Sequence, residues 1–424
     1  MANRIAAPTP ILIALFLGAL FGMGMKWATF GVDAPFPQGQ TWLKWTIENV
    51  TLPAGQIFLH LLFMLAVPIV IAAVISSIAS LDVGRFGRIG LRTLVFSVVT
   101  SGIAVTIGMA LVKAFEPGIG LPESVRMLAV TPALTSSTQQ LPAPSGVSSI
   151  VSMFPENPIK AAANGEIIQL MVFSIIFGIG LSLTKSQAAD TLRSALTGLL
   201  EVLMTLIDLV LKLAPLGVAA LMFSMTARAG TEMMMHLLAY VAVVLLALAI
   251  QLFGIYTVLI RYFGQRSPIA FFTDIRLAML TAFATASSNA TLPTVLKVAD
   301  ENLHLPKHIS GFVLVSGAVM NQNGSAIFSA VTVVFLAQLF GTELTTTQQL
   351  TLMAICILSG IGTAGIPSGD LPVVAMTLAM FNIPAEGIGL ILGVERFLDM
   401  CRTTVNVAGD LVVATCIAKR EEGL

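Results

Sequence analysis

The segment ERFLDMCRTTVNVAGD, near the C-terminal end of the sequence, carries several ionisable side chains within a stretch that is otherwise apolar. On a helix that turns about 100° per residue, four polar side chains fall within roughly 60° of one another, with an arginine on the adjoining edge. They are Glu395, Asp399, Asn406 and Asp410, and the arginine is Arg402. A charge at the centre of a membrane helix costs about 2.5–3.5 kcal/mol, so this face needs partners, a water-filled cavity or a ligand. An ion pair that only ties helices together is the simpler explanation, but it leaves Asn406 and Asp410 unexplained.

Each of these groups suits a particular ligand. Arg402 presents a planar fork that can bind a carboxylate through two hydrogen bonds. Asp399 can accept from an ammonium group, and Asn406 can meet a second carboxylate. Asp410, with Asn321 and backbone carbonyls, offers the hard oxygen ligands that a small monovalent cation needs. The set describes an amino acid with an acidic side chain, bound together with a cation.

The composition places these side chains in a membrane. The chain has 424 residues, of which 56% are hydrophobic and 10% charged, and its mean hydropathy is +0.92. A soluble domain has more charge and less apolar surface, so we predict a polytopic membrane protein. The formal net charge is +0 and the basic residues are scattered, which argues against nucleic acid as a partner. No phosphate-binding GxxxxGK[ST] motif occurs, so no ATP-driven pump is expected.

Apolar runs of about 20 residues predict eight membrane spans. They lie near 10–30, 54–80, 90–114, 166–184, 198–226, 235–262, 308–339 and 387–417. Basic residues gather at 80–92 and 261–307, which places those loops and both termini in the cytoplasm. The connection at 116–165 is rich in Pro, Ser and Thr and is expected to be an extracytoplasmic excursion.

Two further apolar stretches, 267–302 and 347–381, have limbs that are too short to span and centres rich in Gly, Pro, Ser and Thr. Such residues interrupt a helix and leave backbone groups in need of partners, so we predict two re-entrant hairpins. Each hairpin precedes a span for which we predict a polar break, at NQNG (321–324) and at DMCRTTVN (399–406). A hairpin followed by a broken span, found twice in opposite orientation, is typical of transporters that bind substrate at the bilayer midplane.

The motifs TASSNATLP, GAVMNQNGSAIF, GTAGIPSGD and LDMCRTTVNVAGD resemble, in order and spacing, those of the dicarboxylate/amino acid:cation symporter family. The resemblance covers nearly the whole chain. It implies an all-α membrane protein with eight transmembrane helices, two re-entrant hairpins and inverted repeats. It also implies a homotrimer in which a mobile transport domain moves as an elevator against a fixed scaffold. The scaffold would comprise 1–84 and 119–230, and the transport domain 85–118 and 231–424.

The resemblance also implies roles for individual residues. Arg402 would bind the side-chain carboxylate of the substrate, Asp399 its amino group and Asn406 its main-chain carboxylate. The rest of the pocket would comprise Thr403, Ser325, the first hairpin tip at Ser287 and Ser288, and the second tip at Ile366, Pro367 and Ser368, which would serve as the outer gate. A sodium-like site would comprise Asn321, Asn406 and Asp410.

The sequence departs from the family pattern in the seventh span, where the usual NMDGT is NQNGS. The acid expected at 323 is Asn323, which removes the charge that would compensate a cation held beside Thr100 and Ser101. We therefore predict that this second cation site is weak or absent, and that coupling uses sodium, protons or both.

Two charged residues have more than one interpretation. Arg396 either pairs with Asp399 or Glu395, or lies at a lipid or solvent edge. Asp370 is either a gate residue or a solvated loop carboxylate.

We predict a secondary active symporter of glutamate or aspartate, with no enzymatic activity and no cofactor beyond the coupling cation, in the inner membrane of a prokaryote. The alternative substrate class is the C4-dicarboxylates, such as succinate, fumarate and malate. An intramembrane aspartyl protease is disfavoured because Asp399 and Asp410 share one helix. A channel is disfavoured because no repeated filter sequence occurs.

Overall fold

The computed structural model describes residues 8–30, 39–79, 87–120, 151, 154–164, 166–362, 368–384 and 387–422. Within these ranges the protein is helical and contains no strand. The N-terminal half comprises α1 (Pro8–Phe30), α2 (Gly39–Thr46), η1 (Ile47–Thr51), α3 (Leu52–Phe63), α4 (Ala66–Ala79), α5 (Gly87–Phe115), α8 (Pro158–Asn164), α9 (Ile167–Leu183), α10 (Gln187–Leu211) and α11 (Ala214–Ala229). The C-terminal half comprises α12 (Thr231–Ala249), η3 (Ile250–Ile255), α13 (Tyr256–Tyr262), α14 (Pro268–Thr285), α15 (Ser288–Glu301), α16 (Lys307–Met320), α17 (Asn323–Phe340), α18 (Thr346–Gly362), α19 (Leu371–Met380) and α20 (Ile388–Glu422).

Seven helical stretches of the described chain are long and apolar enough to cross a membrane. Six of them coincide with or overlap predicted spans: the α2–α4 stretch, α5, α10, the α12–α13 rod, the α16–α17 pair and α20. The seventh is α14, whose 18 residues are long enough to span, although this limb of the first predicted hairpin was expected to be too short. The predicted first and fourth spans correspond to α1 and α9, whose apolar parts are shorter. The protein is therefore an all-helical membrane protein, and the finer count of eight spans and two hairpins stays a prediction.

Prolines explain why two predicted spans are divided in the structure. The span predicted at 54–80 is split between α3, which ends at Phe63, and α4, which begins at Ala66. Pro68 has no N–H group to donate to the carbonyl four residues earlier, which lies in this break. In the same way, Pro215 near the start of α11 follows the break that divides the span predicted at 198–226. Pro53, at the start of α3, follows the π-helical segment η1.

The two predicted hairpins correspond to α14 with α15 and to α18 with α19. Helix α14 packs against α15, and the turn between them contains Ala286 in the left-handed conformation, with φ of 49°. Ser287 caps α15 by accepting a hydrogen bond from the Ala290 N–H. In the second pair the tip residues Ile366 and Pro367 lie outside the described residues.

The predicted break at 321–324 is confirmed, and the one at 399–406 is wrong. Asn321 and Gln322 leave the helical conformation between α16 and α17, and the Gln322 N–H donates to the Gly360 carbonyl of α18 instead. By contrast, α20 continues without interruption through 399–406. Polar side chains do not end a helix when they find partners, and this segment contains neither proline nor glycine.

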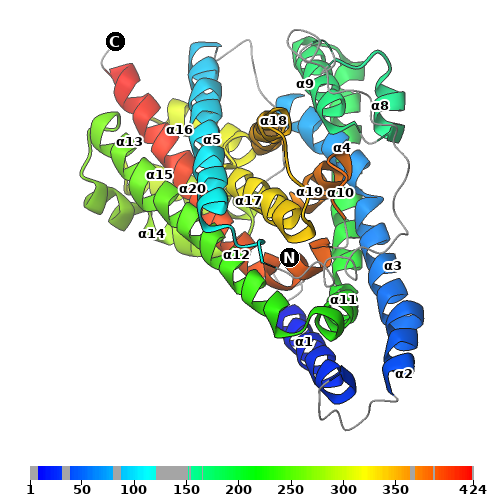
Figure 1. Ribbon diagram of the computed structural model, residues 1–424. Coiled ribbons are helices and arrows are strands. Elements are labelled where there is room, and N and C mark those ends of the chain that lie inside the picture. The colour runs from blue at the N-terminus through cyan, green and yellow to red at the C-terminus, as the bar shows by residue number, and fades with distance from the viewer. Residues whose placement is uncertain are drawn as a thin grey trace.

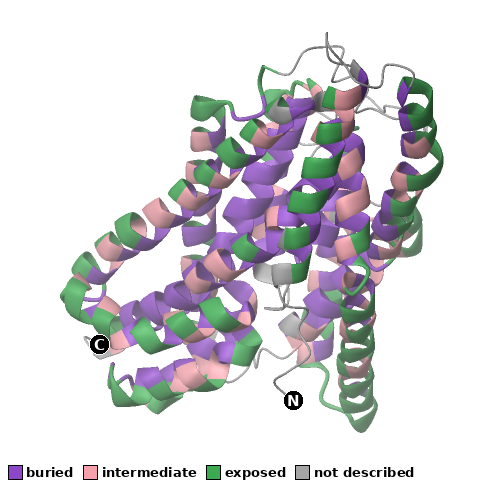
Figure 2. Cartoon of the chain, turned by 90° about the horizontal axis from the view of Figure 1, so that it is seen from below, coloured by how far each residue is buried: buried purple, intermediate pink, exposed green. Residues whose placement is uncertain are grey.

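Helices α17 and α20 form the centre of the molecule. In Figure 1, α5 (cyan), α12 (green) and α20 (red) lie near α17 (yellow), and α17 contacts all three. Helices α13, α14 and α15 flank α20. Buried residues fill the middle of the bundle and exposed residues face outward (Figure 2), so the polar residues of α17 and α20 are held where side chains of several helices surround them.

Candidate functional site

The polar face of α20 forms a buried cluster of charges around Arg402, which is 1% exposed. The Arg402 Nε donates to Asp399 Oδ1 at 2.9 Å, and Nη2 donates to Glu395 Oε1 at 3.0 Å. The guanidinium carbon also lies 4.4 Å from the ring centre of Phe328 on α17. Two carboxylates and one aromatic ring therefore contact the same guanidinium.

The structure decides between the alternatives for Arg396 and Asp370. Arg396 is 8% exposed and its Nη1 lies 3.5 Å from Asp399 Oδ2, so it pairs with the acid and is not a lipid-edge residue. Asp370 is 3% exposed and its Oδ2 lies 3.3 Å from Arg402 Nη1. It is not a solvated loop carboxylate, because it forms part of the charge cluster.

Ser368 connects the second helical pair to the same cluster. Its backbone N–H donates to Asp399 Oδ2 at 3.0 Å, and its hydroxyl donates to Glu395 Oε2 at 3.0 Å. The residue has a φ of 57°, a left-handed conformation in which both donors face α20. The chain segment before α19 is thus bonded directly to the acids that hold Arg402.

One turn further along α20, Asn406 holds the break between α16 and α17. Its Oδ1 accepts from the Gly324 N–H at 2.7 Å, and its Nδ2 donates to Gln322 Oε1 at 2.5 Å and to Ser325 Oγ at 3.3 Å. Backbone groups at a broken helix need such partners inside a membrane. Thr403 is buried on the same helix, between Asn406 and Arg402 in sequence.

Asp410 is a buried acid without a basic partner in the described part of the chain. It is 2% exposed, and its Oδ1 accepts from Asn321 Nδ2 at 3.1 Å. A buried carboxylate with no opposite charge is costly, so it must bind a cation or a proton. Asp410 and Asn321 belong to the sodium-like site expected from the sequence, and that site stays a prediction.

Asn323 lies among the residues predicted to form the second cation site. The Ser101 hydroxyl donates to its Oδ1 at 2.8 Å, while its Nδ2 donates to Tyr256 Oη at 2.9 Å and to Asn321 Oδ1 at 3.1 Å. Thr100 also donates to Asn321 Oδ1, at 3.3 Å. The predicted residues do come together, but the Asn323 Oδ1 that a cation would need already accepts the hydroxyl hydrogen of Ser101.

The turn between α14 and α15 is the predicted tip of the first hairpin. Ser287 and Ser288 are buried, and α15 packs against α20. The Ser288 hydroxyl has no hydrogen-bond partner among the described residues, so a buried donor is left at this tip.

Comparison with known proteins identifies the family. The model of the sodium:dicarboxylate symporter family matches residues 8–420. The chain belongs to the sodium:dicarboxylate symporter family. It is 30% identical to a proton/glutamate-aspartate symporter of Escherichia coli (strain K12), over 97% of this chain and 92% of that protein.

Two other relatives are named for other coupling ions or substrates. The chain is 29% identical to a proton/sodium-glutamate symport protein of Geobacillus stearothermophilus, over 99% of this chain and 95% of that protein. It is 30% identical to a C4-dicarboxylate transport protein of Rhodospirillum rubrum, over 87% of this chain and 82% of that protein. The protein is thus a membrane transporter that performs cation-coupled symport, and it is not an enzyme.

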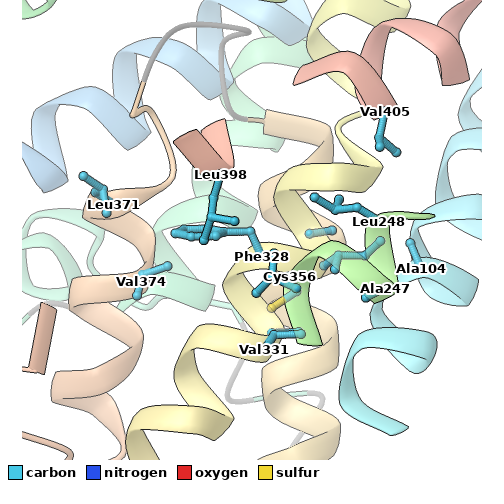
Figure 3. Close-up of a cluster of buried hydrophobic side chains, with 14 of the residues drawn as sticks. Ala104, Ala247, Leu248, Phe328, Val331, Cys356, Leu371, Val374, Leu398 and Val405 are labelled. Carbon is cyan, nitrogen blue, oxygen red and sulfur yellow. The ribbon is translucent and has the colours of Figure 1, made fainter. Parts of the chain in front are cut away.

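Two buried residues that contact the predicted site residues were not singled out in the sequence. Phe328 lies beneath the Arg402 guanidinium, and in Figure 3 it lies beside Leu398 of α20, near Leu371 and Val374 of α19. Tyr256 donates to the Val405 carbonyl at 3.2 Å and accepts from Asn323. Tyr256 could have been noticed in the sequence, because its polar hydroxyl lies in the apolar run LFGIYTVLI and needs a buried hydrogen-bond partner. Phe328 could not, because its sequence context is that of any aromatic core residue.

Substituting Gly324 with alanine is expected to destabilise this family member. A Cβ at Gly324 would lie 2.9 Å from the Arg402 Cα and still closer to its carbonyl oxygen, so α17 would have to move away from α20. Overpacking of this kind costs about 1–3 kcal/mol. We expect a lower thermal unfolding midpoint for the detergent-purified protein. Gly311→Ala is the matched control, because nothing lies within 4 Å of a Cβ at Gly311, and equal midpoints would contradict the expectation.

Proposed function

We propose that the protein takes up an acidic amino acid, glutamate or aspartate, together with sodium, protons or both. The observation that carries this proposal is the pairing of Arg402 with Asp399 at 2.9 Å on one buried helix face. A guanidinium and a carboxylate side by side offer complementary charges to the carboxylate and ammonium groups of one amino acid. Relatives whose names include glutamate or aspartate support the same assignment.

In this proposal Arg402 binds the side-chain carboxylate, Asp399 the ammonium and Asn406 the main-chain carboxylate. Thr403, Ser325, the tip at Ser287 and Ser288, and the second tip at Ile366, Pro367 and Ser368 complete the pocket. Phe328 and Asp370, which contact Arg402, join the set. Since Asn406 is already bonded to Gly324, Gln322 and Ser325, substrate binding must exchange one of these bonds.

Cation coupling in this proposal depends on Asp410, with Asn321 and Asn406. Asp410 is buried without a basic partner in the described ranges, which favours a positively charged occupant. The second site, at Thr100, Ser101 and Asn323, is weak or absent. The Asn323 side chain supports this, because it is uncharged and its Oδ1 already accepts a hydrogen bond from the Ser101 hydroxyl.

The Asn323→Asp variant is expected to strengthen sodium dependence. A carboxylate at this position offers charge to a cation beside Thr100 and Ser101, and loses the amide hydrogens that now face Asn321. We expect the sodium concentration that half-saturates uptake to fall about tenfold, which corresponds to roughly 1.4 kcal/mol of cation binding. Uptake measured over a sodium titration would check this. Asn49→Asp, at an exposed position, is the control, and equal half-saturation in both variants would refute the expectation.

The wider architecture follows the family. We propose a homotrimer in the inner membrane, with both termini cytoplasmic and with eight spans and two hairpins. The scaffold (1–84 and 119–230) would stay fixed while the transport domain (85–118 and 231–424) moves as an elevator. Close packing supports a firm scaffold, because a Cβ at Gly18 of α1 would lie 2.9 Å from the Ala219 Cα of α11. Cross-linking in membranes would test the trimer.

A C4-dicarboxylate is the second candidate substrate, supported by the Rhodospirillum rubrum relative. Such a substrate has no ammonium group, so Asp399 would have no role in binding it. The test is uptake of labelled aspartate, glutamate and succinate into proteoliposomes under a sodium gradient, a proton gradient or neither. Gradient-driven uptake of aspartate or glutamate supports the proposal. Uptake of succinate alone would replace it.

A further inference from the structure

Three carboxylates of the protein itself surround the Arg402 guanidinium. Asp399 and Glu395 belong to α20, whereas Asp370 precedes α19 and reaches Arg402 from another part of the chain. All four side chains are at most 4% exposed, so water does little to screen their charges. The guanidinium that is proposed to bind the substrate carboxylate is thus already contacted by three acids of the protein itself.

The contacts of the three acids differ in quality. Asp399 and Glu395 accept aligned hydrogen bonds from Nε and Nη2 of Arg402, and each also accepts one from Ser368. Asp370 lies 3.3 Å from Nη1, but Nη1 forms no hydrogen bond to any described residue. Nη1 is therefore the nitrogen of Arg402 that offers both of its N–H groups to an incoming carboxylate, and the carboxylate oxygen 3.3 Å from it belongs to Asp370.

The charge count around this donor is unfavourable to another anion. Asp370, Glu395 and Asp399 oppose Arg396 and Arg402, which leaves one negative charge in excess among these residues. A carboxylate that binds Nη1 meets the charge of Asp370 at short range, and like charges at buried positions repel strongly. An uncharged side chain of the same shape meets no such repulsion.

We propose that Asp370 is a specificity-determining residue that competes with the substrate carboxylate for Nη1 of Arg402. Its charge lowers the affinity for acidic amino acids and leaves the affinity for uncharged isosteres unchanged. Asp370 therefore sets how strongly the pocket prefers aspartate to asparagine. This inference rests on the proposed function, in which Arg402 binds the side-chain carboxylate.

The test compares binding of aspartate and asparagine to the full-length wild type and to Asp370→Asn, by calorimetry in detergent. The substitution removes the charge and keeps the shape. We expect aspartate to bind at least tenfold more tightly to the variant, while asparagine affinity stays within threefold. Asp300→Asn removes an acid that is half exposed and pairs with Lys307 in a different region, so it controls for the loss of charge alone.

The change in aspartate affinity between the wild type and Asp370→Asn decides the inference. An aspartate affinity that does not rise in Asp370→Asn overturns the inference, and so does an equal change for both ligands, which would indicate altered packing. Aspartate binding that is measurable only in the variant supports it. If neither protein binds aspartate while succinate binds, the proposed function itself fails and the inference fails with it, so the two failures can be told apart.

Discussion

The Arg402→Cys variant is expected to lose uptake of glutamate and aspartate. Arg402 is the buried group that is proposed to bind the side-chain carboxylate of the substrate. A charge-assisted hydrogen bond contributes about 1.5–3 kcal/mol. Loss of two such bonds corresponds to roughly 10²- to 10⁴-fold weaker binding. Small neutral amino acids such as serine do not need the guanidinium, so we expect uptake of serine to appear. Uptake of labelled amino acids into proteoliposomes is the measurement.

The design must separate lost binding from lost folding. Without Arg402, three buried acids have lost the guanidinium that pairs with them, which is destabilising. The double variant Arg402→Cys/Asp370→Asn relieves part of this repulsion and is expected to give the same loss of acidic uptake. Arg276→Cys, at an exposed position of α14, controls for the new thiol. Unchanged aspartate uptake in folded Arg402→Cys would refute the assignment of the side-chain carboxylate to Arg402.

The Asp410→Asn variant is expected to uncouple transport from the cation gradient. The substitution is isosteric and can still accept from Asn321, so the fold should survive. It removes the buried negative charge, and with it the reason for a cation to bind there. We expect gradient-driven accumulation of substrate to fall at least about 100-fold, equivalent to roughly 2.7 kcal/mol of coupling. Uptake under an imposed sodium or proton gradient measures this.

A matched control lies one turn further along α20. Thr415 is equally buried, and its hydroxyl donates to the Leu411 carbonyl of its own helix at 2.7 Å. Thr415→Val keeps the shape and removes a polar group without touching Asp410, so it should retain gradient-driven accumulation. Accumulation by Asp410→Asn at the level of Thr415→Val would show that this acid does not carry the coupling.

Apolar length and polar residue type made much of the fold and the site predictable. The spans near 90–114 and 387–417 match α5 and α20 closely, because long apolar runs have few alternatives in a bilayer. The cluster of Asp399 with Arg402 was also predictable, since i and i+3 positions meet on a helix. The divided spans could have been predicted from Pro68 and Pro215, whose missing N–H groups are visible in the sequence.

Other features depend on contacts that no local pattern contains. Gly324 and Asn406 are 82 positions apart, and their hydrogen bond requires α17 and α20 to pack face to face. The burial of Asp370 depends likewise on how the chain before α19 approaches α20. The wrong prediction of a break at 399–406 has a simpler cause. Polar side chains were taken as a sign of an interrupted backbone, although partners on α20 itself and on neighbouring segments satisfy them.

Because α20 is one uninterrupted helix, Asp399 and Asp410 are held at a fixed distance from each other. At a rise of about 1.5 Å per residue, Asp399 and Asp410 are separated by about 16 Å along the axis, too far for direct contact. Tilting or sliding the helix carries both together and leaves their spacing unchanged. Beside α20, two consecutive residues contact it at different points: Asn321 is bonded to Asp410 and Gln322 is bonded to Asn406. One peptide unit joins these two residues, so a rotation of that unit would alter both hydrogen bonds to α20 at once.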